Sequence, residues 1–292
     1  MDAPREKTHS RTAGVFTDVQ GHILAAEVVR RHSINQEDIR SLALKGQFLA
    51  GCRKVLDLGC GFGFFTEALK GRVHPEASVT GIDRIEGYRP LFLEAVRKAG
   101  QTGEYLSSGA ATLKTFGKDT YDLVLCSYAL YFFPEIIPDI ARILKRGGKF
   151  ITITHRRKNM GELIAAIRDI LSEKDLCPED PLPVEKVIER FCGENGSMLL
   201  APWFKHVQAI EYENSLTFHR DDQLDLVAYF RYKSPFFLSG LDLETEAAVH
   251  LLSTHLQETL TPAGAFTMSK DDTIFVCSAP LYGRRVLHEE EP

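Results

Sequence analysis

The chain has 292 residues, of which 44% are hydrophobic and 26% charged, a balance typical of a folded protein with a sizeable core. Its formal net charge of −5 disfavours proteins that bind along nucleic acid or an anionic membrane surface. The six cysteines form no Cys-x-x-Cys pair, which disfavours a metal site or a disulfide framework. No stretch is apolar enough for a membrane span, and MDAPREKTHSRTAG has no apolar signal region, so we predict a cytoplasmic protein.

Hydrophobic periodicity predicts helices first, then alternating strands and helices. From 15 to 50 the apolar residues recur at helical spacing, which predicts two or three helices. Short apolar runs then alternate with helical patterns, as expected of a parallel sheet covered on both faces. The predicted strands are 54–59, 78–83, 104–107, 121–127 and 149–154, the last after a turn at 146–148, and the predicted helices are 64–70, 91–99 and 136–144.

After His155 the pattern becomes mixed. The spacing predicts helices at 160–172, 184–191, 224–232 and 243–260, and strands at 207–218 and 273–278. We expect the inserted helices, with the N-terminal ones, to cover the carboxyl ends of the strands. Their aromatic residues suit an apolar or aromatic ligand, or serve only to anchor these helices to the sheet: Phe191, Phe218, Tyr229, Phe230, Tyr232, Phe236 and Phe237.

A glycine-rich loop follows the first predicted strand, in the segment VLDLGCGFGFFT at 55–66. Gly59, Gly61 and Gly63 permit positive φ angles and let a ligand approach the backbone. The first turn of the helix expected next would offer unpaired N–H groups to an anion. The dinucleotide fingerprint G-x-G-x-x-G fails because Phe64 stands at its last position, which disfavours a dehydrogenase.

An acidic residue, Asp83, ends the second predicted strand. Because the ends of neighbouring parallel strands meet at one crevice, we expect Asp83 close to the glycine loop. A carboxylate there can accept hydrogen bonds from both hydroxyls of a ribose. An acid at this position can also cap a helix or lie in solvent, but its place behind the glycine loop favours the ribose.

These motifs resemble the class I S-adenosylmethionine-dependent methyltransferases. The resemblance covers 53–155 through DLGCGFG, the acid of GID, YDLVLCSYAL and LKRGGKFITITH, and the later part is similar to the branch acting on small molecules, which includes quinone-biosynthesis enzymes. It implies an α/β fold with a Rossmann-like, seven-stranded, mostly parallel sheet, helices on both faces and helical cap insertions. The implied divisions are a disordered tail (1–12), N-terminal helices contributing to the cap (13–52), a cofactor-binding core (53–155), the cap with the last strands (156–282) and a tail (283–292).

The resemblance implies S-adenosylmethionine as cofactor, with S-adenosylhomocysteine as product. The methionine half would lie along Asp57 and the glycine loop, the ribose on Asp83, and the adenine beside Gly109 and Ala110. The family often has an acid after the third strand, which the segment SSGAA lacks, so backbone groups would hold the adenine. The residues implied to bind the cofactor are Asp57, Gly59, Cys60, Gly61, Gly63, Asp83, Arg84, Gly109, Ala110, Ser127 and Tyr128.

Catalysis requires mainly that the acceptor be aligned with the methyl group, which supplies roughly 7–11 kcal/mol. A general base also helps if the acceptor is a hydroxyl or an acidic carbon. The candidates are His155, just past the fifth strand, and Tyr128 and Tyr131, whose rings can contact a sulfonium. An exposed loop histidine and ordinary packing tyrosines are the alternative interpretations.

The predicted function is methyl transfer to an oxygen, nitrogen or carbon of a small molecule, with no metal. One alternative is a nucleic-acid or protein methyltransferase, although the segment CSYAL lacks the Asn/Asp-Pro-Pro-aromatic motif of enzymes that methylate exocyclic amines. Another is a regulatory protein that binds S-adenosylmethionine without transferring its methyl group.

Overall fold

The computed structural model describes residues 14–173, 175–176, 181–238 and 244–281; the predicted tails, 1–12 and 283–292, lie outside them. The α-helices are α2 (Val19–His32), α3 (Ile39–Leu44), α4 (Arg89–Lys98), α5 (Ile137–Ile143), α6 (Gly161–Ser172), α7 (Pro183–Glu189), α8 (Gly196–Leu200), α9 (Gln223–Leu238) and α10 (Thr245–Ala263). The 3₁₀ turns are η1 (Gly14–Thr17), η2 (Thr66–Leu69), η3 (Glu86–Tyr88), η4 (Ala110–Thr115), η5 (Leu130–Phe132), η6 (Pro134–Ile136) and η7 (Arg220–Asp222). The strands are β1 (Lys54–Leu58), β2 (Ser78–Asp83), β3 (Thr102–Ser107), β4 (Tyr121–Ser127), β5 (Leu144–His155), β6 (Phe204–Tyr212), β7 (Ser215–His219), β8 (Ala265–Ser269) and β9 (Asp272–Pro280).

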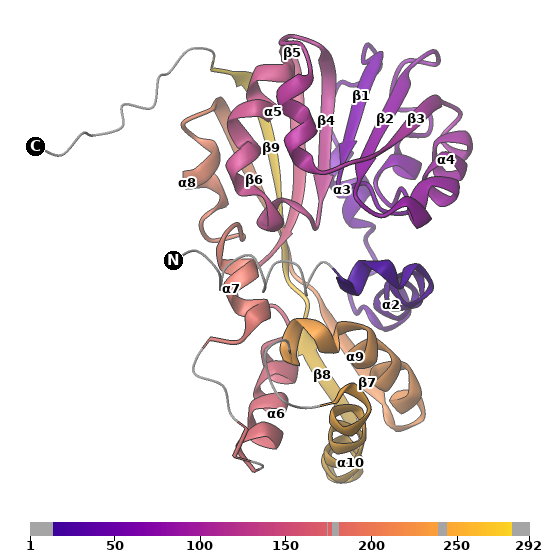
Figure 1. Cartoon of the computed structure of the whole chain (residues 1–292), viewed down its shortest axis with the longest axis vertical. Coiled ribbons are helices and arrows are strands. Elements are labelled where there is room, and N and C mark those ends of the chain that lie inside the picture. Colours follow the sequence, from indigo (N-terminus) through magenta and orange to yellow (C-terminus); the bar gives the residue numbers. More distant parts are fainter. Residues whose placement is uncertain (1–13, 174, 177–180, 239–243, 282–292) are drawn as a thin grey trace, which may run out of the picture.

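The large sheet has seven strands in the order β3-β2-β1-β4-β5-β9-β6, which confirms the predicted fold class (Figure 1). Strands β1 to β5 pair in parallel, whereas β9 is antiparallel to both β5 and β6. The strand order reverses direction at β1, so β1 and β4 lie next to each other at the switch point where such sheets bind ligands.

Alternate residues of the strands face two separate hydrophobic layers. Val55, Leu123 and Ile151 pack on the side that holds α3 and α4, and Leu56 and Val124 pack on the side that holds α5 and α8. Residues in both layers are fully buried, which explains why the strands are apolar on both faces.

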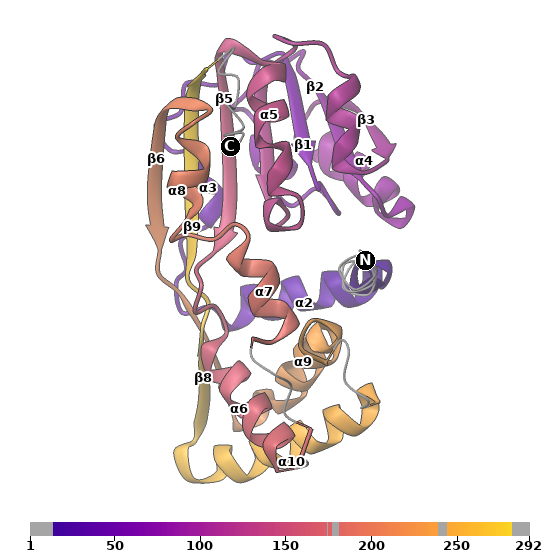
Figure 2. The ribbon, with the colours of Figure 1, turned by 60° about the vertical axis from the view of Figure 1, so that its left-hand side comes forward.

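The remaining helices form a cap beyond one end of the sheet. Figures 1 and 2 show α2, α6, α9 and α10 gathered on the side where β5 leads into α6. They share a hydrophobic core with the two-stranded sheet of β7 and β8. No helix within the described ranges combines the length and the hydropathy that a membrane crossing requires.

Three predicted elements differ from the structure. The α-helix expected at 64–70 is only the 3₁₀ turn η2, because Gly59, Gly61, Gly63 and Gly71 all take positive φ angles on either side of it. The single strand expected at 207–218 is split between β6 and β7, which belong to different sheets. The turn expected at 146–148 lies within β5, where the pairing with β4 shifts register between Tyr121 and Leu123.

Candidate functional site

The glycine loop after β1 has the left-handed backbone that its sequence predicts. The φ angles are +66° at Gly59, +48° at Gly61 and +85° at Gly63. A Cβ atom would lie 2.5 Å from Ala129 at Gly59 and 2.5 Å from Ala95 at Gly63, so these two glycines allow close packing within the protein. At Gly61 the nearest atom, in His22, would be 4.0 Å away. Gly61 is therefore the loop glycine that leaves room for a ligand.

Two carboxylates flank this loop. One oxygen of Asp57 accepts a hydrogen bond of 2.6 Å from the Thr66 hydroxyl, while Oδ1 is buried and has no hydrogen-bond partner among the described residues. Burial raises the pKa of Asp57 to about 7. The carboxylate of Asp83 accepts hydrogen bonds of 3.0 Å from the backbone N–H groups of Gly61 and Ile85, which ties the end of β2 to the loop. Burial also raises the pKa of Asp83.

These features fit a cationic nucleoside such as S-adenosylmethionine. The unpartnered oxygen of Asp57 can accept a hydrogen bond from an ammonium group, and each oxygen of Asp83 keeps a lone pair for a ribose hydroxyl. The α-helix expected at 64–70 is only a 3₁₀ turn, so a ligand would meet the backbone N–H groups of the glycine loop rather than a helix N-terminus.

His22, on α2, covers the loop from the cap side. Its Nδ1 lies 2.7 Å from the Tyr88 hydroxyl, and its ring stacks on Tyr232 at 5.5 Å and meets the edge of Phe62 at 5.1 Å. Burial, followed by the charge of Lys233, lowers the pKa of His22 to about 3. A neutral imidazole therefore links the cap to the glycine loop at neutral pH.

A second polar cluster lies where β5 ends. Nδ1 of His155 is 2.7 Å from Oδ1 of Asp272, and the Tyr128 hydroxyl donates a hydrogen bond of 2.7 Å to Oδ2 of the same carboxylate. Lys270 Nζ lies 3.1 Å from that Oδ2 atom. The rings of Tyr128 and Tyr131 stack on His155 with centroid distances of 4.9 and 5.8 Å. His155 is only 9% exposed, so its interpretation as an exposed loop residue is wrong.

The contacts of His155 define its tautomer. Because Asp272 can only accept, the 2.7 Å contact favours a proton on Nδ1 over the longer 3.4 Å approach of the Lys270 ammonium group to the same atom, which leaves a lone pair on Nε2. Burial and the charge of Lys270 lower the pKa of His155 to about 4, against the opposing effect of Asp272. Burial of Asp272 favours its neutral form, but Lys270 and His155 hold its pKa below the usual value. At neutral pH the cluster thus contains a neutral histidine with one free nitrogen and an ionised carboxylate.

Tyr128 connects the two clusters. Its ring lies 6.2 Å from that of Phe64, next to the glycine loop, while its hydroxyl bonds to Asp272. Its φ of +54° is unusual for a residue other than glycine. Because this hydroxyl already bonds to Asp272, Tyr128 can offer its ring rather than a free hydroxyl to a ligand.

The other predicted cofactor residues lie at the ends of four strands, β1 to β4. Cys60 is buried in the loop, and its N–H donates to the Ile82 carbonyl at 3.1 Å. Gly109 and Ala110 open η4 after β3, with the stem of the exposed Arg84 close to Gly109. Ser127 ends β4 and pairs with Ile153 of β5. The positions of these residues match the expectation that the ends of β1 to β4 meet, but their ligand contacts stay predictions.

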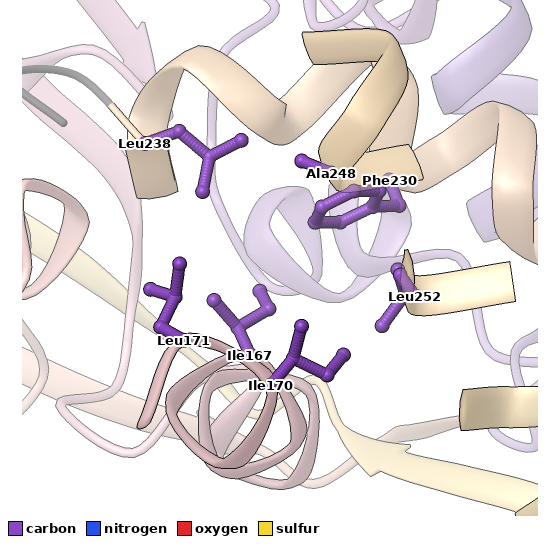
Figure 3. Close-up of a pocket in the computed structure, with 7 residues that line it drawn as sticks. All are labelled: Ile167, Ile170, Leu171, Phe230, Leu238, Ala248 and Leu252. Carbon is purple, nitrogen blue, oxygen red and sulfur yellow. The ribbon is translucent and has the colours of Figure 1, made fainter. Parts of the chain in front are cut away.

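An apolar gap lies inside the cap, between α6, α9 and α10 (Figure 3). Of the aromatic cap residues predicted to suit a ligand it contacts one, Phe230, and its lining has no charged side chain: Ile167, Ile170, Leu171, Phe230, Leu238, Ala248 and Leu252. It has room for about one water molecule, and we attribute it to loose packing.

Sequence reasoning missed four residues of the site: His22, Lys233, Lys270 and Asp272. Asp272 is 117 positions from His155 along the chain, and only the pairing of β5 with β9 brings them together. A charged residue beside an apolar strand was the available signal for Lys270 and Asp272. For Lys233 the signal was a cation within an aromatic helix segment, YFRYKSPFF.

Comparisons with known proteins agree with this geometry. Residues 56–152 match the model of a methyltransferase domain family. The chain is 30% identical over 172 residues to the ubiquinone biosynthesis O-methyltransferase of Aliivibrio fischeri, which covers 57% of this chain and 69% of that protein. It is 35% identical over 124 residues to the enzyme of the same name from Pseudomonas entomophila, covering 41% of this chain and only 51% of that protein. The crystal structure of YcgJ from Bacillus subtilis shares the fold, with a TM-score of 0.50, 18% identity and coverage of 82% and 97% of the two chains.

Proposed function

Because the chain belongs to the class I S-adenosylmethionine-dependent methyltransferases, in a branch similar to quinone-biosynthesis enzymes, we propose that it methylates a hydroxyl group of a small molecule. The observation that carries this proposal is the buried pair of His155 and Asp272, which Tyr128 connects to the glycine loop. S-adenosylmethionine, when bound, supplies a methyl group that its sulfonium already activates. The chain must therefore hold the cofactor, orient the acceptor and remove one proton.

Cofactor binding falls to the loop and the two carboxylates. Asp57 Oδ1 accepts a hydrogen bond from the ammonium group of the methionine half, and Gly61 provides the open stretch of backbone. Asp83 holds the ribose hydroxyls, and Arg84, Gly109 and Ala110 flank the adenine. Tyr128, with Ser127 at the end of β4, presents its ring face toward the sulfonium, a favourable arrangement for a cation.

Proton removal falls to His155. Its free Nε2 takes the proton of the acceptor hydroxyl as the oxygen bonds to the methyl carbon and the carbon–sulfur bond breaks. Asp272 keeps the required tautomer and stabilises the imidazolium that forms, and Lys270 keeps Asp272 ionised. Tyr131 stacks on the imidazole and fixes its plane. General bases of this kind contribute about 10²- to 10⁴-fold to a rate.

The cap forms the side of the site that receives the methyl acceptor. The sequence predicts that this cap consists of residues 13–52 and 156–282, which flank the core 53–155. The names of the two relatives support an oxygen nucleophile over nitrogen or carbon.

A cytoplasmic location is also part of the proposal. Its support is that the cysteines of the described residues are free thiols: Cys52, Cys60, Cys126, Cys192 and Cys277.

The direct test is a transfer assay. Purified protein is incubated with methyl-labelled S-adenosylmethionine and a set of hydroxylated aromatic compounds, and products are identified by mass spectrometry. We expect label on an oxygen of at least one compound and none with the variant Asp83→Ala. Tight binding of S-adenosylhomocysteine without any transfer would instead favour a regulatory role.

A further inference from the structure

Lys233 lies in the middle of an aromatic face of α9. Tyr229 and Phe236 are four and three positions from it along the helix and therefore share its side, while Tyr232 directly precedes it. The Lys233 ammonium group lies 5.9, 5.6 and 5.5 Å from the centroids of these three rings, respectively. An ammonium group next to several rings is partly stabilised by their π electrons.

This aromatic face points toward the candidate site. Tyr232 stacks on His22, which lies over Gly61, and the ring of Phe236 is 6.4 Å from that of Phe132, next to Tyr131. The Lys233 charge is also close enough to lower the pKa of both His22 and His155. The charge of Lys233 therefore acts on both the residue that covers the loop and the candidate base.

The charges around Lys233 do not balance. Lys270 pairs with Asp272 at 3.1 Å, whereas no carboxylate in the described ranges forms an ion pair with Lys233. Two lysines share one carboxylate, and both neighbouring histidines are neutral at pH 7. An anionic ligand would stabilise a partly buried cation that has no carboxylate paired with it. Lys233 is partly exposed, which leaves it accessible to a solute.

We propose that Lys233 binds an anionic group of the methyl acceptor, and that the acceptor is a small aromatic acid. The rings of Tyr229, Tyr232 and Phe236 suit a flat unsaturated body, and the lysine suits its carboxylate. Lys233 is then a specificity residue: it distinguishes an acid from a neutral compound of the same shape. This inference rests on the proposed function, because it assumes that the site faced by His155 receives the acceptor.

The test compares acids with their amides in the presence of saturating S-adenosylhomocysteine. The probes are benzoate with benzamide, salicylate with salicylamide and cinnamate with cinnamamide, and binding is measured by calorimetry. We expect at least one acid to bind about tenfold or more tightly than its amide. If no acid in the set binds more tightly than its amide, the proposal is wrong.

Two variants assign the preference to the lysine. Lys233→Met should abolish the acid preference and leave the affinity for S-adenosylhomocysteine within about twofold, since methionine retains an apolar side chain of similar length. Arg231→Met removes one positive charge from the same helix at an exposed pair with Glu246 and should keep the preference. A preference that survives Lys233→Met would overturn the assignment. A large loss of S-adenosylhomocysteine binding in that variant would mean that Lys233 serves the cofactor instead.

The two proposals fail in different ways. Calorimetry detects acceptor binding without turnover, so a protein that prefers acids but transfers no methyl group contradicts only the proposed function. A protein that methylates neutral phenols and shows no acid preference contradicts only the role of Lys233.

Discussion

His155 and Asp272 stand directly opposite each other on the antiparallel strands β5 and β9, with Nδ1 of the imidazole 2.7 Å from Oδ1 of the carboxylate. The register of the sheet sets this contact, since a shift of one residue would turn one side chain to the other face. It places a neutral histidine, held in one tautomer, at the end of the strand that leads into the cap.

Replacing Asp272 with asparagine should lower the turnover rate about 100-fold or more, because an amide can donate to Nδ1 and so favour the tautomer without a free Nε2. Affinity for S-adenosylhomocysteine should change little. The measurements are single-turnover kinetics and calorimetry. The matched control is Asp271→Asn, a neighbouring acid whose carboxylate accepts a bond from the Asn214 N–H. Equal rates for the two variants would exclude a role for Asp272 in the proton transfer.

Replacing Asp83 with asparagine should weaken cofactor binding about 10- to 100-fold. The amide keeps one oxygen for a backbone N–H but loses the charge and the second acceptor that the ribose needs. The melting temperature should fall only slightly, because the hydrogen bonds that tie the Asp83 carboxylate to the protein come from backbone N–H groups, those of Gly61 and Ile85 among them, which an amide oxygen can also accept. Glu86→Gln removes an exposed acid three residues away and is the control. If both variants bind S-adenosylhomocysteine like the wild type, Asp83 does not hold the ribose.

Alanine at Gly59 should mainly lower stability, whereas alanine at Gly61 should mainly weaken cofactor binding. At Gly59 the new Cβ would lie 2.5 Å from Ala129, so we expect a loss of at least about 2 kcal/mol in unfolding free energy. At Gly61 the space is open, so the cost is backbone strain of about 1–2 kcal/mol, while the methyl group projects into the ligand's position. Denaturant unfolding and calorimetry separate the two effects. If Gly61→Ala binds the cofactor as tightly as the wild type, the ligand does not lie next to this glycine.

The core of the fold follows from local sequence, whereas the candidate site depends on contacts between residues that are far apart along the chain. Buried parallel strands are apolar on both faces, and glycines with positive φ leave a recognisable spacing, so β1, β2 and the loop were predictable. The sequence offers His155 as a candidate base, but it does not reveal whether a residue after a strand is buried. That depends on Asp272, which sheet pairing brings opposite it from a remote segment.

The α-helix expected after the loop does not form, and the reason is local. The apolar residues of 64–70 have helical spacing, yet the loop glycines before it and Gly71 after it leave space for only the short turn η2. The roles of His22 and Lys233 could not be predicted, because each depends on how the cap helices pack over the sheet. Apolar periodicity indicates which face of a helix is buried but not what it is buried against.

Cofactor affinity should rise with pH through about 7, because burial raises the pKa of Asp57 to about 7 and only its ionised form attracts an ammonium group. Below pH 7 the Asp57 carboxyl must lose a proton before the cofactor binds, so the affinity falls by up to about tenfold for each pH unit. Well above pH 7 the carboxyl is already ionised, and the affinity should change by less than about twofold. Calorimetry with S-adenosylhomocysteine between about pH 5.5 and 8.5 measures this dependence. In Asp57→Asn the affinity should be lower and nearly independent of pH in that interval, since the amide does not titrate. A wild-type affinity that stays constant across the interval, or a variant that keeps the wild-type slope, would show that Asp57 does not hold the ammonium group.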